Sequence, residues 1–528
     1  MSSTRSSDLE RSTVKSSGKT ATTNTQTAGY QGIIDLADDH GTAESCPTNS
    51  QLKHSFNIWS SLGLQYSLTS TPLLIGTYLS LVIGVGGSPT FIYGYIVAVV
   101  LNLCVCATLA EIAAIYPHTS GTMYWTAVMA PEKHARILSY AVAWLLCGAL
   151  LLLTGGTYLI TSQLICAMIT ICSTEFIPQP WHVYTLYILA ALLALIFNLP
   201  PLFTLYPTML KAMPISITTG ALFILTVLLI RTSAKQSSQF VWLTFTNTTN
   251  WPSHVVVFFL GLLPGATAVN GFDGASHLSS ELPDPKHTVP RVMLGSAVLS
   301  ALSGLPMCIV YMYCVTDASA LLSPIGGQPL AQLFLDSLHS LPLTIISLLI
   351  VIVCLVACGV CMLTAFARVA WKLAQRNGLP ASGWVAAVSP GCGLPVHAVL
   401  FCSGLCVAVG AIVLGSTTAI NAVIGGGMAL LYLTWLPLLM LVLCKRGTMF
   451  PARRSFNLGR AGRLVNVVSV VWIPFVVVWM CFPLYLPVTA ASMNYAAVVI
   501  VGTLFISGLN WVGYSSGRYE VPVAMELK

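Results

Sequence analysis

The sequence predicts an all-α polytopic membrane protein with twelve transmembrane helices. Of its 528 residues, 56% are hydrophobic and only 7% are charged, whereas soluble domains carry roughly 25% charged residues. Apolar runs long enough to cross a bilayer recur along the chain, and two of them are interrupted by proline and glycine. The composition therefore excludes a soluble fold, and with it a nucleic-acid-binding module, which would need a basic face with aromatics on a soluble domain.

The chain begins with a polar segment, residues 1–54, which is rich in Ser and Thr and carries scattered charges of both signs. Such a segment cannot bury a core, so we predict a disordered tail. No basic-then-apolar signal peptide precedes the first apolar run. We therefore expect the tail to remain on the cytoplasmic side of the membrane.

From Phe56 onward the chain is dominated by apolar segments of membrane-spanning length. We expect residues 55–515 to form one transporter domain and residues 516–528 to form a cytoplasmic C-terminal tail. The expected segments are 56–83, 89–115, 137–171, 182–200, 207–231, 254–280, 290–316, 331–375, 396–414, 417–444, 465–486 and 494–514.

The distribution of basic residues predicts the orientation of these segments. Loops 117–136 and 281–291 hold two Lys or Arg residues each and loop 445–464 holds six, as expected of cytoplasmic loops. Loop 232–253 instead contains the glycosylation sequon Asn247-Thr248-Thr249, which requires the outside face. Both signals place the N- and C-termini in the cytoplasm. We expect the plasma membrane, with the vacuolar membrane as the alternative.

The sixteen cysteines do not indicate a metal or redox centre. Most lie inside apolar runs, where cysteine behaves as a small hydrophobe. Cys358 and Cys361 form a C-x-x-C pair, but no second pair or nearby His accompanies it. We expect no metal and no cofactor. Since no nucleophile, metal-ligand or phosphate-loop constellation stands on a soluble face, we also expect no enzyme.

The sixth segment is broken in the stretch 264–291. It contains Pro264-Gly265 and then two glycines, Gly271 and Gly274, with Asp273 between them. A carboxylate and weak backbone inside an apolar run are costly in hydrocarbon, so such a feature is expected to line a cavity.

The first segment is broken in a similar way. Hydroxyl-bearing residues crowd before Pro72, and proline removes a helical donor. If residues 56–231 and 254–444 are two repeats, both breaks fall at corresponding positions, which indicates the midplane site of an inverted-repeat transporter. Unwound backbone offers amides to a carboxylate and carbonyls to a cation. The alternative is a proline kink satisfied by neighbouring Ser or Thr.

We expect the substrate to be bound at these breaks and by the third segment. The candidate residues are Ser67, Thr69, Ser70, Thr71 and Gly76 in the first segment, Thr267, Asn270, Gly271 and Phe272 in the sixth, and Tyr158 in the third. The amide of Asn270 would find no hydrogen-bond partner if it faced lipid. Phe272 either covers an onium head by cation–π attraction or simply packs.

Three ionisable residues are candidates for gating or coupling. Asp273 pairs with a substrate amine, carries the coupling proton, or braces the sixth segment. His277 follows it by four residues and shares its face if helix resumes there. Glu111 is a proton carrier or a member of an ion pair at an inner gate, and Arg368 is within its reach if the second and eighth segments lie together.

Residues 56–522 resemble the amino acid–polyamine–organocation superfamily, and within it the fungal amino acid/choline/GABA permeases. The similarity rests on Gly86-Gly87-Ser88-Pro89, Ala110-Glu111, the run Pro117 to Trp125, Gly271-Phe272-Asp273 with His277 and Glu281, Phe456-Asn457-Leu458-Gly459, and Pro487-Val488-Thr489. It implies a five-plus-five inverted-repeat core, two extra helices at 465–514, and proton-coupled uptake or exchange of a small nitrogenous solute. Ser120, Ser280 and Asn377 depart from the family pattern.

The substrate class remains open between two chemistries. The hydroxyl-rich, acid-free break at Ser67–Pro72 favours a zwitterionic solute such as an amino acid or GABA. A choline- or polyamine-type cation would instead need aromatic rings, such as those of Phe272, Tyr158 or Trp435. A nutrient sensor that binds the same solute without transporting it is a further alternative.

Overall fold

The computed structural model describes residues 56–173, 175–389, 393–415, 417–450, 454–490 and 493–522. The N-terminal tail predicted at 1–54 lies outside these ranges, as do residues 523–528 of the predicted C-terminal tail. Within them the chain is almost entirely helical, which confirms the predicted all-α class. One short ladder pairs β1 (Val85–Gly86) antiparallel with β2 (Thr246–Asn247).

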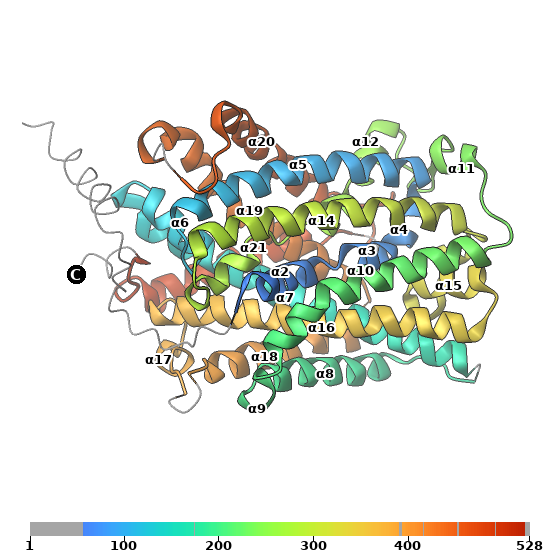
Figure 1. Cartoon of the computed structure of the whole chain (residues 1–528), viewed down its shortest axis with the longest axis horizontal. Coiled ribbons are helices and arrows are strands. Elements are labelled where there is room, and N and C mark those ends of the chain that lie inside the picture. The colour runs from blue at the N-terminus through green and yellow to red at the C-terminus, as the bar shows by residue number, and fades with distance from the viewer. Residues whose placement is uncertain are drawn as a thin grey trace, which may run out of the picture. The chain divides into compact units, whose positions relative to one another are not determined.

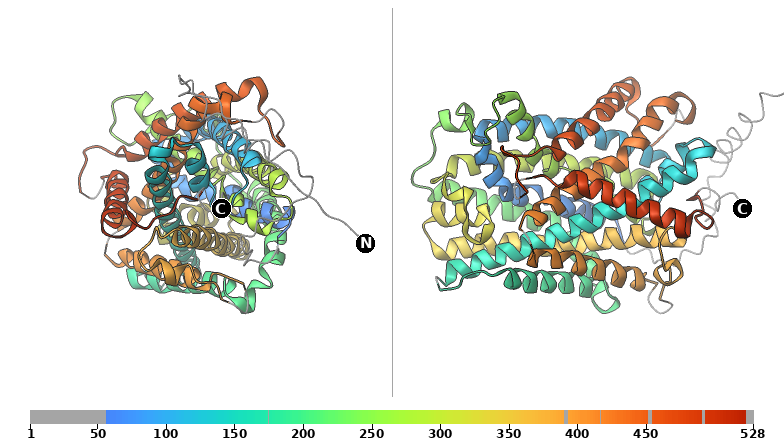
Figure 2. Two further views of the ribbon diagram at one scale, coloured as in Figure 1. Left: turned by 90° about the vertical axis from the view of Figure 1, so that its left-hand side faces the viewer. Right: turned by 180° about the vertical axis from the view of Figure 1, so that it is seen from behind.

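The long helices run side by side along one common direction (Figure 1), and Figure 2 also shows them nearly end-on. They are α5 (Gly87–Ile115), α7 (Glu132–Cys172), α8 (Pro180–Phe197), α10 (Tyr206–Arg231), α14 (Pro285–Cys314), α16 (Leu341–Gln375), α19 (Thr417–Met449), α20 (Gly462–Cys481) and α21 (Ala496–Asn510). Short helices lie at their ends: α11 (Ser238–Trp242) and α15 (Pro329–Leu338) at one end, α6 (Thr122–Met129) and α17 (Ser382–Val385) at the other.

Ten helical stretches among the described residues are long and apolar enough to cross a membrane. Two shorter apolar stretches, His254–Ala268 and Val396–Gly410, occupy the places of the sixth and ninth expected segments. The count of twelve crossings therefore stays a prediction, as do the repeat and domain boundaries. The predicted continuous eighth helix, 331–375, is wrong. It is divided into α15 and α16 at His339, whose φ of 47° is left-handed and ends a helix.

The first segment breaks where the sequence indicates. Helix α2 (Ile58–Thr69) ends at Ser70, which has a left-handed φ of 39° and donates its N–H to the carbonyl of Tyr66. A four-residue helix, α3 (Thr71–Leu74), follows with Pro72 in its first turn. The segment then continues as a 3-10 turn and α4 (Leu79–Gly84). Proline suits a helix start but not a helix interior, so it favours a new helix here.

The sixth segment is also interrupted. Helices α12 (His254–Leu260) and α13 (Leu263–Ala268) are followed by irregular backbone through Asp273 and then by a 3-10 helix, η2 (Gly274–Glu281). Gly271 lies in the irregular part with φ +66°, a conformation that glycine adopts without steric cost.

Side chains of the first segment bind the exposed backbone of the sixth. The Thr71 hydroxyl donates to the carbonyl of Ala268 at 2.6 Å. The amide of Gln65 donates to the carbonyl of Gly271 and accepts the N–H of Ala275. Because unpaired peptide groups are costly in a membrane, these bonds stabilise the break and join the two interrupted segments to each other.

Asn102 of α5 completes this network. Its Nδ2 donates to the carbonyls of Ala266 and Val269 at 3.0 and 2.8 Å. Its Oδ1 accepts from Tyr432 on α19 and Trp472 on α20, both at 2.7 Å. The buried amide thus uses both donors and both lone pairs, and one side chain holds four elements together.

Replacing Asn102 by Leu should destabilise the fold. The Val269 carbonyl and the Trp472 indole N–H lose their partner, whereas the Tyr432 hydroxyl keeps its bond to the Ala266 carbonyl. Each buried group left unpaired costs about 1–3 kcal/mol. We expect the melting temperature of the purified protein to fall by several degrees. Val100→Leu, on the same helix at a side chain that is 55% exposed, should leave it unchanged. Equal melting temperatures for the two variants would contradict this role of Asn102.

Candidate functional site

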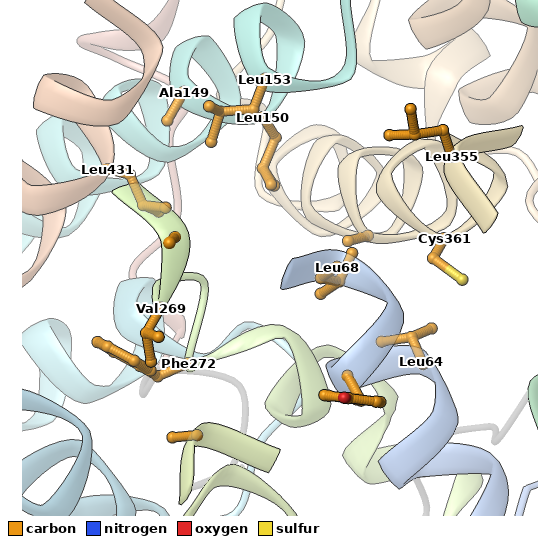
Figure 3. Close-up of a cluster of buried hydrophobic side chains, with 14 of the residues drawn as sticks. Leu64, Leu68, Ala149, Leu150, Leu153, Val269, Phe272, Leu355, Cys361 and Leu431 are labelled. Carbon is orange, nitrogen blue, oxygen red and sulfur yellow. The ribbon is translucent and has the colours of Figure 1, made fainter. Parts of the chain in front are cut away.

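A cavity of about 80 Å³ lies between the two breaks. Its walls come from the first segment, the sixth segment, α7, α16 and α19. Figure 3 shows three of these walls through Leu68, Leu153 and Leu431, with Val269 and Phe272 of the broken segment nearby. No lining residue among those described carries a charge, so polar contact there comes from hydroxyls, one amide and the backbone.

Four of the predicted substrate-binding residues line this cavity: Thr69, Thr267, Asn270 and Gly271. The hydroxyl of Thr69 bonds with Ser300 at 2.9 Å, and that of Thr267 donates within its own helix to Leu263 at 3.0 Å. The N–H groups of Asn270 and Phe272 form no hydrogen bond with any described residue. The site therefore has unused amide donors in the unwound stretch.

The other hydroxyls of the first break do not face the cavity. Ser70 donates to the carbonyl of Ser67 at 2.9 Å and Thr71 to that of Ala268, while the Ser67 hydroxyl is buried beside the Cys361 thiol. Gly76 lies against α15, because a Cβ there would meet the Leu330 side chain at 2.5 Å. These positions shape and support the break and do not line the cavity.

The aromatic rings considered for an onium head also lie outside the lining. Phe272 stacks on Trp435 with ring centroids 5.3 Å apart. Tyr158 packs edge-on against Tyr187 at 5.6 Å, and its buried hydroxyl forms no hydrogen bond with any described residue. The aromatic side chain that does line the cavity is Tyr78.

Sequence reasoning missed several cavity residues, namely Tyr78 and the sulfur-containing Cys358, Met362 and Met428. It also missed the supporting amides of Gln65 and Asn102. A signal for Asn102 was present, since it is a polar residue isolated in an apolar run, whereas Gln65 stands among several hydroxyl-bearing residues. No comparable signal marks the sulfur side chains, because methionine and cysteine in membrane helices resemble ordinary packing residues.

Asp273 lies behind the cavity lining and is 2% exposed. Its Oδ2 is 3.7 Å from Nε2 of His277, and the Trp435 side chain lies beside the carboxylate. The other ring nitrogen of His277 is 3.2 Å from the carbonyl of Thr119. The pair therefore links the break to the turn before α6.

Two buried ion pairs involve the remaining charged candidates. Arg368 on α16 binds Glu281 at the end of η2, with Nε and Oε1 3.1 Å apart. Glu111 near the end of α5 instead binds Arg454 and also accepts the N–H of Leu458. Glu111 is thus a member of an ion pair, but its partner is Arg454 and not Arg368, which pairs with Glu281.

The sequon is exposed at Asn247 on β2. Its amide donates to the carbonyl of Trp251 and accepts from the Thr249 hydroxyl at 2.6 Å. Three residues, Ser120, Ser280 and Asn377, depart from the family pattern, and the structure gives a reason for Asn377. It follows α16 with φ 56°, a position where asparagine is an accepted substitute for glycine.

Comparison with known proteins agrees with this architecture. Residues 56–505 match the family model described as amino acid permease. A choline transporter of Saccharomyces cerevisiae is 29% identical over 486 residues, covering 90% of this chain and 84% of the relative. Amino-acid permease BAT1 of Arabidopsis thaliana is 26% identical, covering 90% and 94%. Amino-acid permease 2 of Neurospora crassa is 27% identical, covering 88% and 85%.

These relatives are transporters and permeases, not enzymes. The matched range contains both helix breaks, the cavity between them and the side chains that hold the unwound backbone. The chain is thus a multi-pass membrane protein that belongs to the amino acid permease family.

Proposed function

We propose that this permease is a secondary active transporter that moves a zwitterionic amino acid or a related solute such as GABA by alternating access. The observation that carries the proposal is the uncharged cavity between two helix breaks, which is lined by Asn270, a residue whose backbone N–H forms no hydrogen bond with any described residue. Unwound backbone at such a site offers donors to a carboxylate. Hydroxyls of Thr69 and Thr267 supply further polar contacts.

A choline-like cation is the second candidate, and the Saccharomyces cerevisiae relative named a choline transporter favours it. An onium head in this cavity would contact Tyr78 and the sulfur atoms of Cys358, Met362 and Met428. The zwitterion is the better match to the site, because its ionised carboxylate is a stronger acceptor for the unpaired amides of the break than the single hydroxyl of choline.

We further propose that uptake is coupled to protons through Asp273 and His277. Both side chains are buried, they approach within 3.7 Å, and they adjoin the break. A proton gained or lost there changes the charge directly behind the substrate. The pairs Glu111–Arg454 and Glu281–Arg368 act in this proposal as the inner gate.

The orientation in the same proposal places both termini in the cytoplasm of a plasma-membrane protein. The basic loops support it, and Asn247 supports it as a glycosylation site on the outside. In the structure, β2 pairs with β1 at the end of the molecule where α11 and α15 lie (Figure 1).

Uptake of labelled amino acids, GABA, polyamines and choline into a transport-null host at two pH values tests the substrate class. Thr267→Val and Asn270→Ala should each reduce uptake of the zwitterion by about two- to tenfold, the worth of one hydrogen bond. Thr226→Val is the control, because this threonine is exposed on α10. Uptake of choline alone, unaffected by Thr267→Val and Asn270→Ala, would refute the zwitterion proposal.

Asp273→Asn tests proton coupling. The amide keeps the shape of the side chain but cannot exchange a proton, so we expect slower uptake that no longer depends on pH when the membrane potential is clamped. Asp317→Asn, at an exposed carboxylate that binds Ser319, should behave as wild type. A variant at position 273 with normal rate and normal pH response would exclude an essential role for this charge.

Asn247→Gln tests the orientation. The expressed protein should lose the glycan and migrate faster in a denaturing gel, like wild type treated with a glycosidase. Thr248→Ala preserves the sequon and should keep the slower migration. If wild-type protein migrates identically before and after glycosidase, the outside placement of this loop loses its support.

A further inference from the structure

Three sulfur-containing side chains line the cavity: Cys358 and Met362 on α16 and Met428 on α19. Met428 is hydrogen-bonded to the side-chain amide of Asn270, a predicted substrate-binding residue. Nδ2 of Asn270 donates to its sulfur at 3.4 Å. Oδ1 of Asn270 accepts the N–H of Gly271 at 2.7 Å. The side-chain amide is thus fixed at its oxygen and held at its nitrogen by one sulfur contact.

That sulfur contact is easily exchanged. A thioether is a weak acceptor, whereas hydrogen bonds to an ionised oxygen are shorter and roughly twice as strong as neutral ones. The low dielectric of a buried site strengthens the difference. A carboxylate or carbonyl oxygen that reaches Asn270 should therefore displace Met428 from Nδ2.

The backbone around Met428 is fixed while its side chain is adaptable. Gly426 and Gly427 precede it, and a Cβ on Gly426 would meet Val499 of α21 at 2.7 Å. A Cβ on Gly427 would meet Leu152 of α7 at 3.0 Å. Helix α19 is therefore closely packed on both neighbours here. The unbranched methionine side chain has three rotatable bonds, so rotation of the side chain moves the sulfur without moving the helix.

We propose that Met428 is a specificity-determining residue that occupies one of the two side-chain N–H donors of Asn270 in the empty site and yields it to an oxygen of the substrate. Solutes with a strong oxygen acceptor displace the sulfur, and solutes without one leave the contact in place. This inference rests on the proposed function, because it deepens the account of which solute the cavity takes.

Two volume-conserving substitutions test the exchange. Met428→Leu removes the competing acceptor, so KM for a carboxylate-bearing solute should fall by about two- to tenfold, the range of one hydrogen bond. Met428→Gln supplies a stronger acceptor of similar length and should raise KM. Met440→Leu is the matched control, since Met440 lies on the same helix and its side chain is 51% exposed. Surface expression of each variant normalises the uptake rates.

The same substitutions in an Asn270→Leu background complete a double-mutant cycle. Without the amide donor, KM should no longer distinguish Leu, Met and Gln at position 428. Suppose that the wild type transports an amino acid. If the order of KM is absent or reversed with Asn270 present, or if the same order persists in the Asn270→Leu background, the role of Met428 is refuted and the proposed function stands. If the wild type transports only polyamines, both fail. If it transports choline and the order holds for the choline hydroxyl, the zwitterion proposal fails and the role of Met428 stands.

Discussion

The site depends on one requirement, that peptide groups of a broken helix inside a membrane find hydrogen-bond partners. Asn102, Gln65 and Thr71 satisfy it for the sixth segment by binding four carbonyls, those of Ala266, Ala268, Val269 and Gly271. Four carbonyls of the break are therefore paired, while the N–H groups of Asn270 and Phe272 form no hydrogen bond with any described residue. The break thus keeps donors available, which suits a ligand with oxygen acceptors.

Two buried ion pairs of the described structure lie outside the cavity lining. The cavity lining is neutral, whereas Arg368, Glu281, Arg454 and Glu111 form buried pairs elsewhere. A buried pair that loses one partner leaves an uncompensated charge, which costs about 3–5 kcal/mol. Breaking these ion pairs during a transport cycle would incur that free-energy cost unless water hydrates the separated charges. Breaking them therefore requires that water reach both pairs.

The helical class, both interruptions and four of the cavity residues could be predicted from local sequence, because hydrophobic runs, Pro72 and Gly271 act through nearby backbone. The direction in which a side chain faces could not. Thr69 lines the cavity whereas Thr71, two residues later, binds a carbonyl of another helix. Likewise, Glu111 finds its partner in a segment more than 300 residues away. Such pairings depend on how distant helices pack, and periodicity carries no information about that packing.

The small β ladder also constrains how the molecule can move. Val85 and Gly86 end the first segment, and their partners Asn247 and Thr246 precede the sixth, with Thr248 bonded to the carbonyl of Gly84 as well. The ends of both interrupted segments next to this ladder are thus joined by hydrogen bonds, so we expect displacement of one to carry the other. A label attached at Asn247 would therefore report this joined unit and not either segment alone.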